Sequence, residues 1–128
     1  MNKEFIPYEQ ALELNELGFD EVCMAGYDGD DNSLYIGYST SEGVQYNPEY
    51  YIKAPLYSQA FRWFRDKKLS DSYVYRYQDR TDGSINYGYS IIHDYGIEEI
   101  RFIKENYTSY EEAELTCLKK LIEIVKNK

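Results

Sequence analysis

The chain has 128 residues, of which 43% are hydrophobic and 29% charged, and its formal net charge is −9. This length fits a single domain, and the composition excludes a disordered chain, a collagen-like repeat and a low-complexity segment. The negative charge argues against binding to duplex nucleic acid or to an anionic membrane surface, since both need clustered cations. The sequence has no apolar run long enough to span a membrane and begins without an apolar signal core, so we expect a cytoplasmic protein.

The charge imbalance lies entirely in the first part of the chain. Residues 1–54 hold eleven acidic residues against two cations, Lys3 and Lys53, whereas residues 55–128 hold twelve of each sign. Such an acidic segment is either a solvated surface that keeps the protein in solution or a docking face for a basic partner.

Helix and turn signals organise this acidic segment. Pro7 suits the first turn of a helix, and Gly18 followed by Phe19 is a common stop. We expect a helix over residues 8–17, turn formers over 26–33, a strand over 34–38, a loop over 39–48 with room for a short strand at 44–46, and a strand over 50–52.

A second helix is predicted from Pro55 to about residue 69, because apolar side chains recur there at positions i, i+3, i+4 and i+7. Its opposite side carries the densest cationic cluster in the chain. That cluster is either a solvated helix surface or the anion-binding part of a site. It consists of Arg62, Arg65, Lys67 and Lys68.

Strand signals fill the next forty residues. Residues 73–77 alternate tyrosine with Val74 and Arg76, which favours a strand. An Asp-Gly pair within residues 79–84 indicates a hairpin turn. The return strand is expected over residues 85–92, and a turn over 94–96 leads to a third strand or a short helix over 97–104.

The last predicted helix begins at Ser109, which forms a capping box with Glu112. Its apolar arc, which includes Cys117 and Leu121, is wide enough to be buried on two sides. Residues 55–128 therefore have the order α-β-β-β-α. We expect an α+β fold in which an antiparallel sheet is covered by helices on one face, within one domain spanning residues 1–128.

No metal or cofactor site is expected. Cys23 and Cys117 lie far apart in the sequence and predict two free thiols, and a single histidine adds too few ligands for zinc. Asp28, Asp30 and Asn32 resemble the opening of a calcium loop. The residues that follow lack the glycine and glutamate that such a loop requires at its sixth and twelfth positions.

Catalytic motifs are missing from the sequence as well. His93 precedes Asp94 at a strand end, where neighbouring side chains point apart, and we expect a solvent-exposed or strand-end histidine. The sequence has neither a Gly-x-Ser-x-Gly elbow nor a glycine-rich phosphate loop. We therefore expect no catalytic residue.

Sixteen tyrosines are the most unusual feature of the composition. The two-residue period places Tyr73, Tyr75 and Tyr77 on one face of their strand, and Tyr87 and Tyr89 are expected across the hairpin from them. These rings either cover a half-buried sheet face or form an aromatic platform that contacts a protein or stacks on a nucleobase.

Three segments carry a resemblance: residues 11–20, residues 54–67 from Ala-Pro-Leu-Tyr to Arg-Asp-Lys, and residues 110–122 from Tyr-Glu-Glu-Ala to Lys-Leu-Ile. Together they resemble a group of small uncharacterised proteins encoded by phages and mobile elements of Bacteroidota. The resemblance implies a small accessory protein in the host cytoplasm that acts by binding, often against host defences. It transfers no catalytic or binding residue to this chain.

The leading functional hypothesis is a non-enzymatic protein that binds a host protein through the tyrosine-rich face, the acidic N-terminal segment, or both. A second hypothesis is a sponge for a small nucleotide signal, with tyrosines stacking on the base and Arg62 or Arg65 holding phosphate. A third is a small enzyme of unknown reaction.

Overall fold

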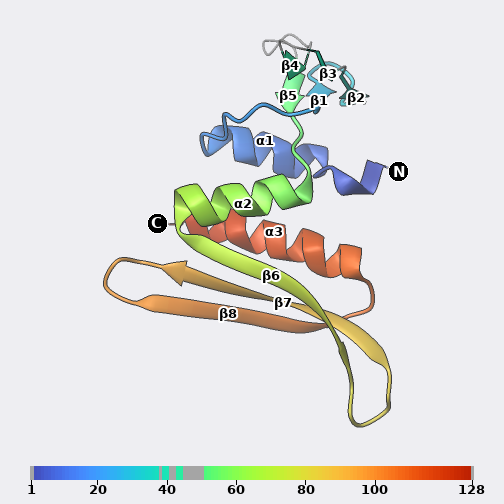
Figure 1. The fold of residues 1–128 in the computed structure, drawn as a ribbon, viewed down its shortest axis with the longest axis vertical. Helices are drawn as coiled ribbons and strands as arrows, with labels where there is room; N and C mark the ends of the chain where they lie inside the picture. Colours follow the sequence, from blue (N-terminus) through green and yellow to red (C-terminus); the bar gives the residue numbers. More distant parts are fainter. Residues whose placement is uncertain (1, 38, 41–42, 45–50, 128) are drawn as a thin grey trace. The chain divides into compact units, whose positions relative to one another are not determined.

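The computed structural model describes residues 2–37, 39–40, 43–44 and 51–127 (Figure 1). These residues form the helices α1, α2 and α3 and two antiparallel three-stranded sheets, which confirms the predicted α+β class. The chain divides into two compact units, Met1–Ala60 and Phe61–Lys128. The division falls within α2 (Tyr57–Lys68), whereas the sequence analysis placed the boundary between the two parts before this helix, after residue 54. That the two parts form one domain stays a prediction.

The first unit pairs one helix with a sheet of order β2-β1-β5. Helix α1 packs against β5, where the side-chain amide of Asn15 donates to the carbonyl of Lys53 at 3.2 Å. Strand β3 pairs antiparallel with β4, which corrects the loop predicted to begin at residue 39. The described elements are η1 (Asn2–Glu4), α1 (Tyr8–Glu16), β1 (Ala25–Asp28), β2 (Leu34–Ile36), β3 (Ser39–Thr40), β4 (Gly43–Val44) and β5 (Tyr51–Lys53).

Strand β1, the centre of this sheet, corrects the sequence analysis, which took residues 26–33 as turn formers. Gly26 and Asp28 are turn-prone locally, but Ala25 and Tyr27 are buried between β2 and β5. The hydroxyl of Tyr27 donates to the carbonyl of Ile6 at 2.7 Å. Burial of these side chains therefore outweighs the local preference for a turn.

The other predictions for this unit are largely confirmed. Helix α1 occupies residues 8–16, and Gly18 follows it at a φ of 100°, a left-handed conformation that favours glycine. Of the strand predicted over 34–38, the structure shows residues 34–36 as β2. Of the strand predicted over 50–52, it shows residues 51–52 as part of β5. Residues 38 and 45–50, which complete those strands and the one predicted at 44–46, lie outside the described residues.

The second unit places a sheet of order β6-β7-β8 against α3. Its elements are β6 (Ser70–Gln78), β7 (Ile85–Asp94), β8 (Glu99–Tyr107) and α3 (Tyr110–Lys126), preceded by the C-terminal half of α2. Figure 1 shows α2 and α3 on the same side of this sheet. The segment predicted as a strand or a helix over 97–104 is strand β8.

Helix α3 begins as the sequence predicts. The backbone amide of Glu112 donates to the hydroxyl of Ser109 at 3.1 Å, which satisfies one of the free amides of the first turn. One side of the helix is buried and contacts all three strands, and it includes Cys117 and Leu121. Within the described residues, no helix is both long and apolar enough to cross a membrane.

Replacing Leu121 with alanine tests how firmly α3 packs in the core. Leu121 is fully buried, so Leu121→Ala is expected to lower the free energy of unfolding by about 2–5 kcal/mol in urea melts. Lys119→Ala, on the exposed side of the same helix, is the control and should change it by less than about 0.5 kcal/mol. A loss below about 1 kcal/mol for Leu121→Ala would show that α3 is not docked as described.

Candidate functional site

Strand pairing sorts the side chains of the β6-β7-β8 sheet onto two faces. Val74 pairs with Tyr89 and Tyr75 pairs with Gly88, and directly paired residues point to the same side. The side chains of Tyr89 and Val74 therefore lie on the face that packs against α3. The other face, which we call the open face, comprises Asp71, Tyr73, Tyr75 and Tyr77 of β6, Asn86, Gly88, Ser90, Ile92 and Asp94 of β7, and Glu99, Arg101, Ile103 and Glu105 of β8.

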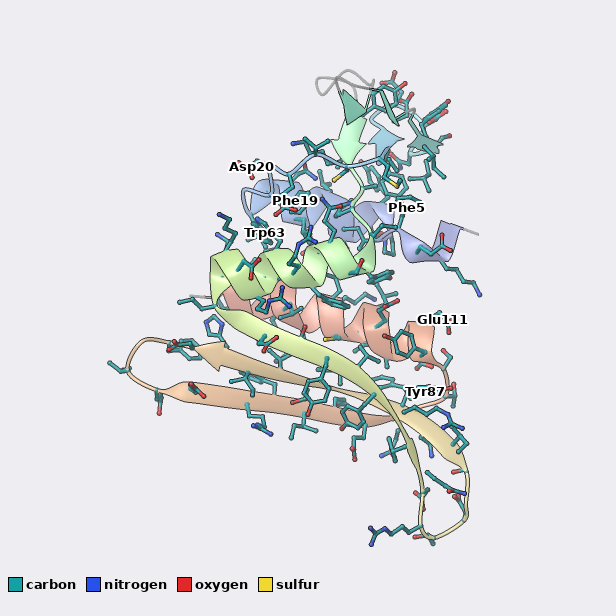
Figure 2. The ribbon with its side chains drawn as sticks, in the orientation of Figure 1. Phe5, Phe19, Asp20, Trp63, Tyr87 and Glu111 are labelled. Carbon is teal, nitrogen blue, oxygen red and sulfur yellow. The ribbon has the colours of Figure 1, made fainter. Side chains whose placement is uncertain are left out.

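The structure separates the five tyrosines that the sequence grouped together. Tyr73, Tyr75 and Tyr77 lie on the open face, but Tyr87 and Tyr89 lie on the face toward α3. Figure 2 shows Tyr87 near the N-terminal end of α3, and its ring meets that of Tyr110 at 6.2 Å, edge to face. The pairing register, which the sequence alone did not resolve, is the reason for the split.

The three open-face tyrosines form a continuous row of rings. Neighbouring ring centroids are 5.7 Å apart between Tyr73 and Tyr75 and 6.0 Å apart between Tyr75 and Tyr77. The ring of Tyr75 packs over β7 at Gly88, where the lack of a side chain lets it approach the backbone closely. A Cβ atom there would lie 3.0 Å from Cζ of Tyr75 and 2.8 Å from the carbonyl oxygen of Lys104.

Hydrogen bonds to β8 fix the far ends of two of these rings, those of Tyr75 and Tyr77. The hydroxyl of Tyr75 donates to Oε2 of Glu105 at 2.5 Å, and that of Tyr77 donates to Oδ1 of Asn106 at 2.8 Å. The backbone amide of Asn106 donates in turn to the Tyr77 hydroxyl at 2.9 Å. Partial burial, together with the bond to Glu105, raises the pKa of Tyr75 above its ordinary value.

The row is accessible as well as ordered. The side chain of Tyr73 is 56% exposed, and so is that of Ile103, its counterpart on β8. Between them lies Ser90, which is only 2% exposed. The open face thus offers aromatic and aliphatic surface held in a fixed conformation, with Asp71 and Arg101 among its charged neighbours. Such a surface suits recognition of another flat surface.

The cationic cluster of α2 lies apart from this row. Arg62 and Arg65 belong to α2, and this helix lies on the same side of the sheet as α3, opposite the open face (Figure 1). Nε of Arg65 lies 3.2 Å from Oδ1 of Asp66, and the ammonium of Lys68 lies 5.3 Å from the Trp63 ring centroid. The structure therefore does not bring the arginines and the tyrosine row into one site.

His93 lies near the end of strand β7, which is one of the two expected alternatives, but it is fully buried and not exposed. The two-residue alternation that turns Tyr89 and Ile91 toward α3 also turns His93 that way. Its Nδ1 atom lies 2.5 Å from the hydroxyl oxygen of Ser70, which is itself fully buried. Neither group is accessible to a substrate, so this Ser–His pair serves the core.

The two cysteine thiols and the carboxyl of Glu114 are also buried, to differing degrees. Cys23 and Cys117 are free, and burial raises the pKa of each thiol to about 12, which makes both poor nucleophiles. Burial, with a contribution from Glu111, raises the pKa of Glu114 to about 7. Among the described residues, no group of three or more His, Cys, Asp or Glu side chains could hold a metal ion.

Comparisons with known proteins add no further assignment. No protein-family model matches the sequence, and no curated protein and no solved structure shows significant similarity to it.

Replacing Gly88 with alanine tests whether the row depends on a bare backbone. The added methyl group would press on Tyr75 and on the Lys104 carbonyl, so Gly88→Ala is expected to lower the free energy of unfolding by about 1–3 kcal/mol. Ser90→Ala, on the same strand and face, adds no atom and is the control. Equal urea midpoints for the two variants would contradict the close approach of Tyr75 to β7.

The pH dependence of stability tests the burial of Glu114. Its pKa rises from 4.5 to about 7, so the folded state holds the proton more tightly, and the ionised carboxylate opposes folding increasingly between these values. Glu114→Gln should therefore raise the urea midpoint at pH 8 and leave it unchanged at pH 4.

Removal of one negative charge elsewhere controls this experiment, and Glu99→Gln on β8 provides it. Glu114 also lies near the N-terminus of α3, where the helix dipole favours a negative charge. A lower midpoint for Glu114→Gln at pH 8 would mean that this dipole outweighs the cost of burial.

Proposed function

We propose that the chain is a non-enzymatic accessory protein, of the phage and mobile-element type that it resembles, which binds a host protein through the open face. The observation that best supports this proposal is the row Tyr73-Tyr75-Tyr77. Tyr73 is exposed at one end of the row, and the rings of Tyr75 and Tyr77 are held by contacts with Gly88 and β8. Rings that are already ordered lose little conformational freedom on binding, which favours affinity.

The chemistry of the open face indicates the kind of partner. Rings and aliphatic side chains suit an apolar patch on a folded protein, and tyrosine hydroxyls add hydrogen bonds at its margin. The charged residues of this face are mostly acidic, since Asp71, Glu99 and Glu105 stand against Arg101, so the face disfavours a polyanionic partner. A host defence protein is one partner that the resemblance would imply.

This proposal is better supported than the two alternatives. The nucleotide sponge, as the sequence suggested it, needs tyrosines and Arg62 or Arg65 around one ligand. Helix α2, which carries both arginines, lies on the other side of the sheet from the tyrosine row (Figure 1). An enzyme needs an accessible reactive group, whereas His93 and Ser70 are buried. The absence of a suitable constellation among the described residues favours binding over catalysis.

A role for the acidic N-terminal segment stays a prediction. Part of its acidity lies in the turn between β1 and β2, where Oδ1 of Asp28 accepts from the amide of Asp30 at 2.8 Å. Oδ1 of Asp31 accepts from the amide of Ser33 at 2.9 Å, and these local bonds stabilise the turn. Asp31 is exposed to solvent, and Asp28 is half-buried.

Replacing Tyr73 with serine tests the open face with little risk to the fold. Because this ring is largely exposed, Tyr73→Ser should lower the free energy of unfolding by less than about 1 kcal/mol. It should weaken capture of the partner from host lysate by about tenfold or more, as loss of a central interface tyrosine does. Capture is quantified against immobilised wild-type protein.

The matched control is Tyr35→Ser in the first unit, since Tyr35 is 50% exposed and also has one aromatic neighbour, Tyr51. If Tyr35→Ser abolishes capture and Tyr73→Ser does not, the interface lies on the acidic unit and the open-face proposal is wrong.

A further inference from the structure

A groove runs along the outer edge of the β6-β7-β8 sheet, between strand β8 and helix α3. It encloses about 490 Å³ and is lined by Arg101, Phe102, Ile103 and Lys104 of β8 and by Thr116 and Lys120 of α3. The rings of Tyr89 and Tyr107, stacked at 6.1 Å, lie beside it. The groove therefore has a strand as one wall and a helix as the other.

The strand wall carries backbone groups that no other strand uses. Strand β8 pairs only with β7 among the described residues, so its second edge is open. The amide of Tyr95 donates to the carbonyl of Glu98 at 2.9 Å, and antiparallel pairs alternate from that point between hydrogen-bonded and non-hydrogen-bonded. By this alternation the N–H and C=O groups of Arg101 and Ile103 point outward, at the positions that line the groove.

The charge around the groove is opposite to that of the chain as a whole. Lys104 and Lys120 lie on its helix side, and the side chain of Arg101 lies on the open-face side of the same edge. Among the described residues that line the groove none is acidic, although Glu99 and Glu105 lie on the same side of β8 as Arg101. Lys120 contacts Oε2 of Glu123 at 3.3 Å at the margin, and its ammonium lies 4.9 Å from the Phe102 ring centroid.

We propose that this groove binds an extended peptide with acidic side chains, which adds to β8 as a fourth strand of the sheet. Addition to an exposed strand beside a helix is a known mode of peptide recognition, in which backbone hydrogen bonds supply affinity and side chains supply specificity. The surface involved is the sheet edge, which shares Arg101 and Ile103 with the open face but none of its tyrosines, so the proposal does not rest on the tyrosine row.

The two-residue period of an added strand explains why its charges matter. Alternate side chains of the peptide would point into the groove toward Lys104 and Lys120, and the others toward Arg101 and Ile103. Glutamate or aspartate in the first set would meet cations, whereas lysine would meet like charge. The competing explanation is that these cations only protect an edge strand from pairing, a common use of lysine at sheet edges.

A binding experiment separates these explanations. The probe is a short, end-blocked, fluorescein-labelled peptide that alternates valine with glutamate, and its control has lysine in place of glutamate. Fluorescence anisotropy with the full chain should detect binding of the glutamate peptide and not of the lysine peptide. Lys104→Glu should weaken binding by about five- to tenfold, since one attraction becomes a repulsion.

Lys119→Glu is the matched control, because it makes the same change of charge on an exposed position of α3 outside the groove lining. It should alter binding by no more than about twofold, because solvent and salt screen charges at that distance. No binding of the glutamate peptide, or equal loss in both variants, would overturn the proposal.

Two further measurements test strand addition itself. Saturating peptide should slow hydrogen exchange of the Arg101 and Ile103 amides, which point outward in the free protein. Ile103→Pro removes one outward amide without removing a β7–β8 bond and should abolish binding. If ATP instead binds more tightly than the peptide and Ile103→Pro leaves that binding intact, the groove is an anion pocket and strand addition is wrong.

Discussion

The register between β6 and β7 is the constraint on which the second unit depends. Pairing Val74 with Tyr89 and Tyr75 with Gly88 sends one set of side chains into the core under α3 and leaves the other on the open face. A slip of one residue would exchange the two sets, so that tyrosines would crowd α3 and Val74 would meet solvent. The core contacts of α3 and the exposed row are thus two results of a single alignment.

The open face stabilises a sheet that has a helical layer on one side only. Rings of β6 lie across β7, reach Glu105 and Asn106 on β8, and link the two edge strands that do not pair with each other. They also help to shield the backbone of β7 at Gly88 and Ser90, where the side chains are too small to cover it from water. A surface built in this way is rigid because the same contacts that order the rings hold the strands together.

Local signals explain which parts of the structure the sequence predicted. The capping box at Ser109, the Asp-Gly turn and the alternation of residues 73–77 each depend on neighbours in the chain, and each was found. Three features depend instead on which distant segment of the chain pairs with a given strand. They are the existence of strand β1, the burial of His93, and the separation of Tyr87 and Tyr89 from the tyrosine row. Hydrophobic period alone cannot supply that partner, because it fixes a face relative to the strand and not relative to the next strand. The groove beside β8 was missed for the same reason, since its two walls come from separate elements.

The two buried thiols allow each unit to be followed separately. Cys23 belongs to the first unit and Cys117 to the second, and each is shielded from solvent with a pKa near 12. A thiol reagent reacts with such a group only when the surrounding structure opens. The rate at which each cysteine is alkylated under native conditions therefore reports the opening equilibrium of its own unit, without any added label. Single-cysteine variants would turn this property into two independent reporters, one for each half of the chain.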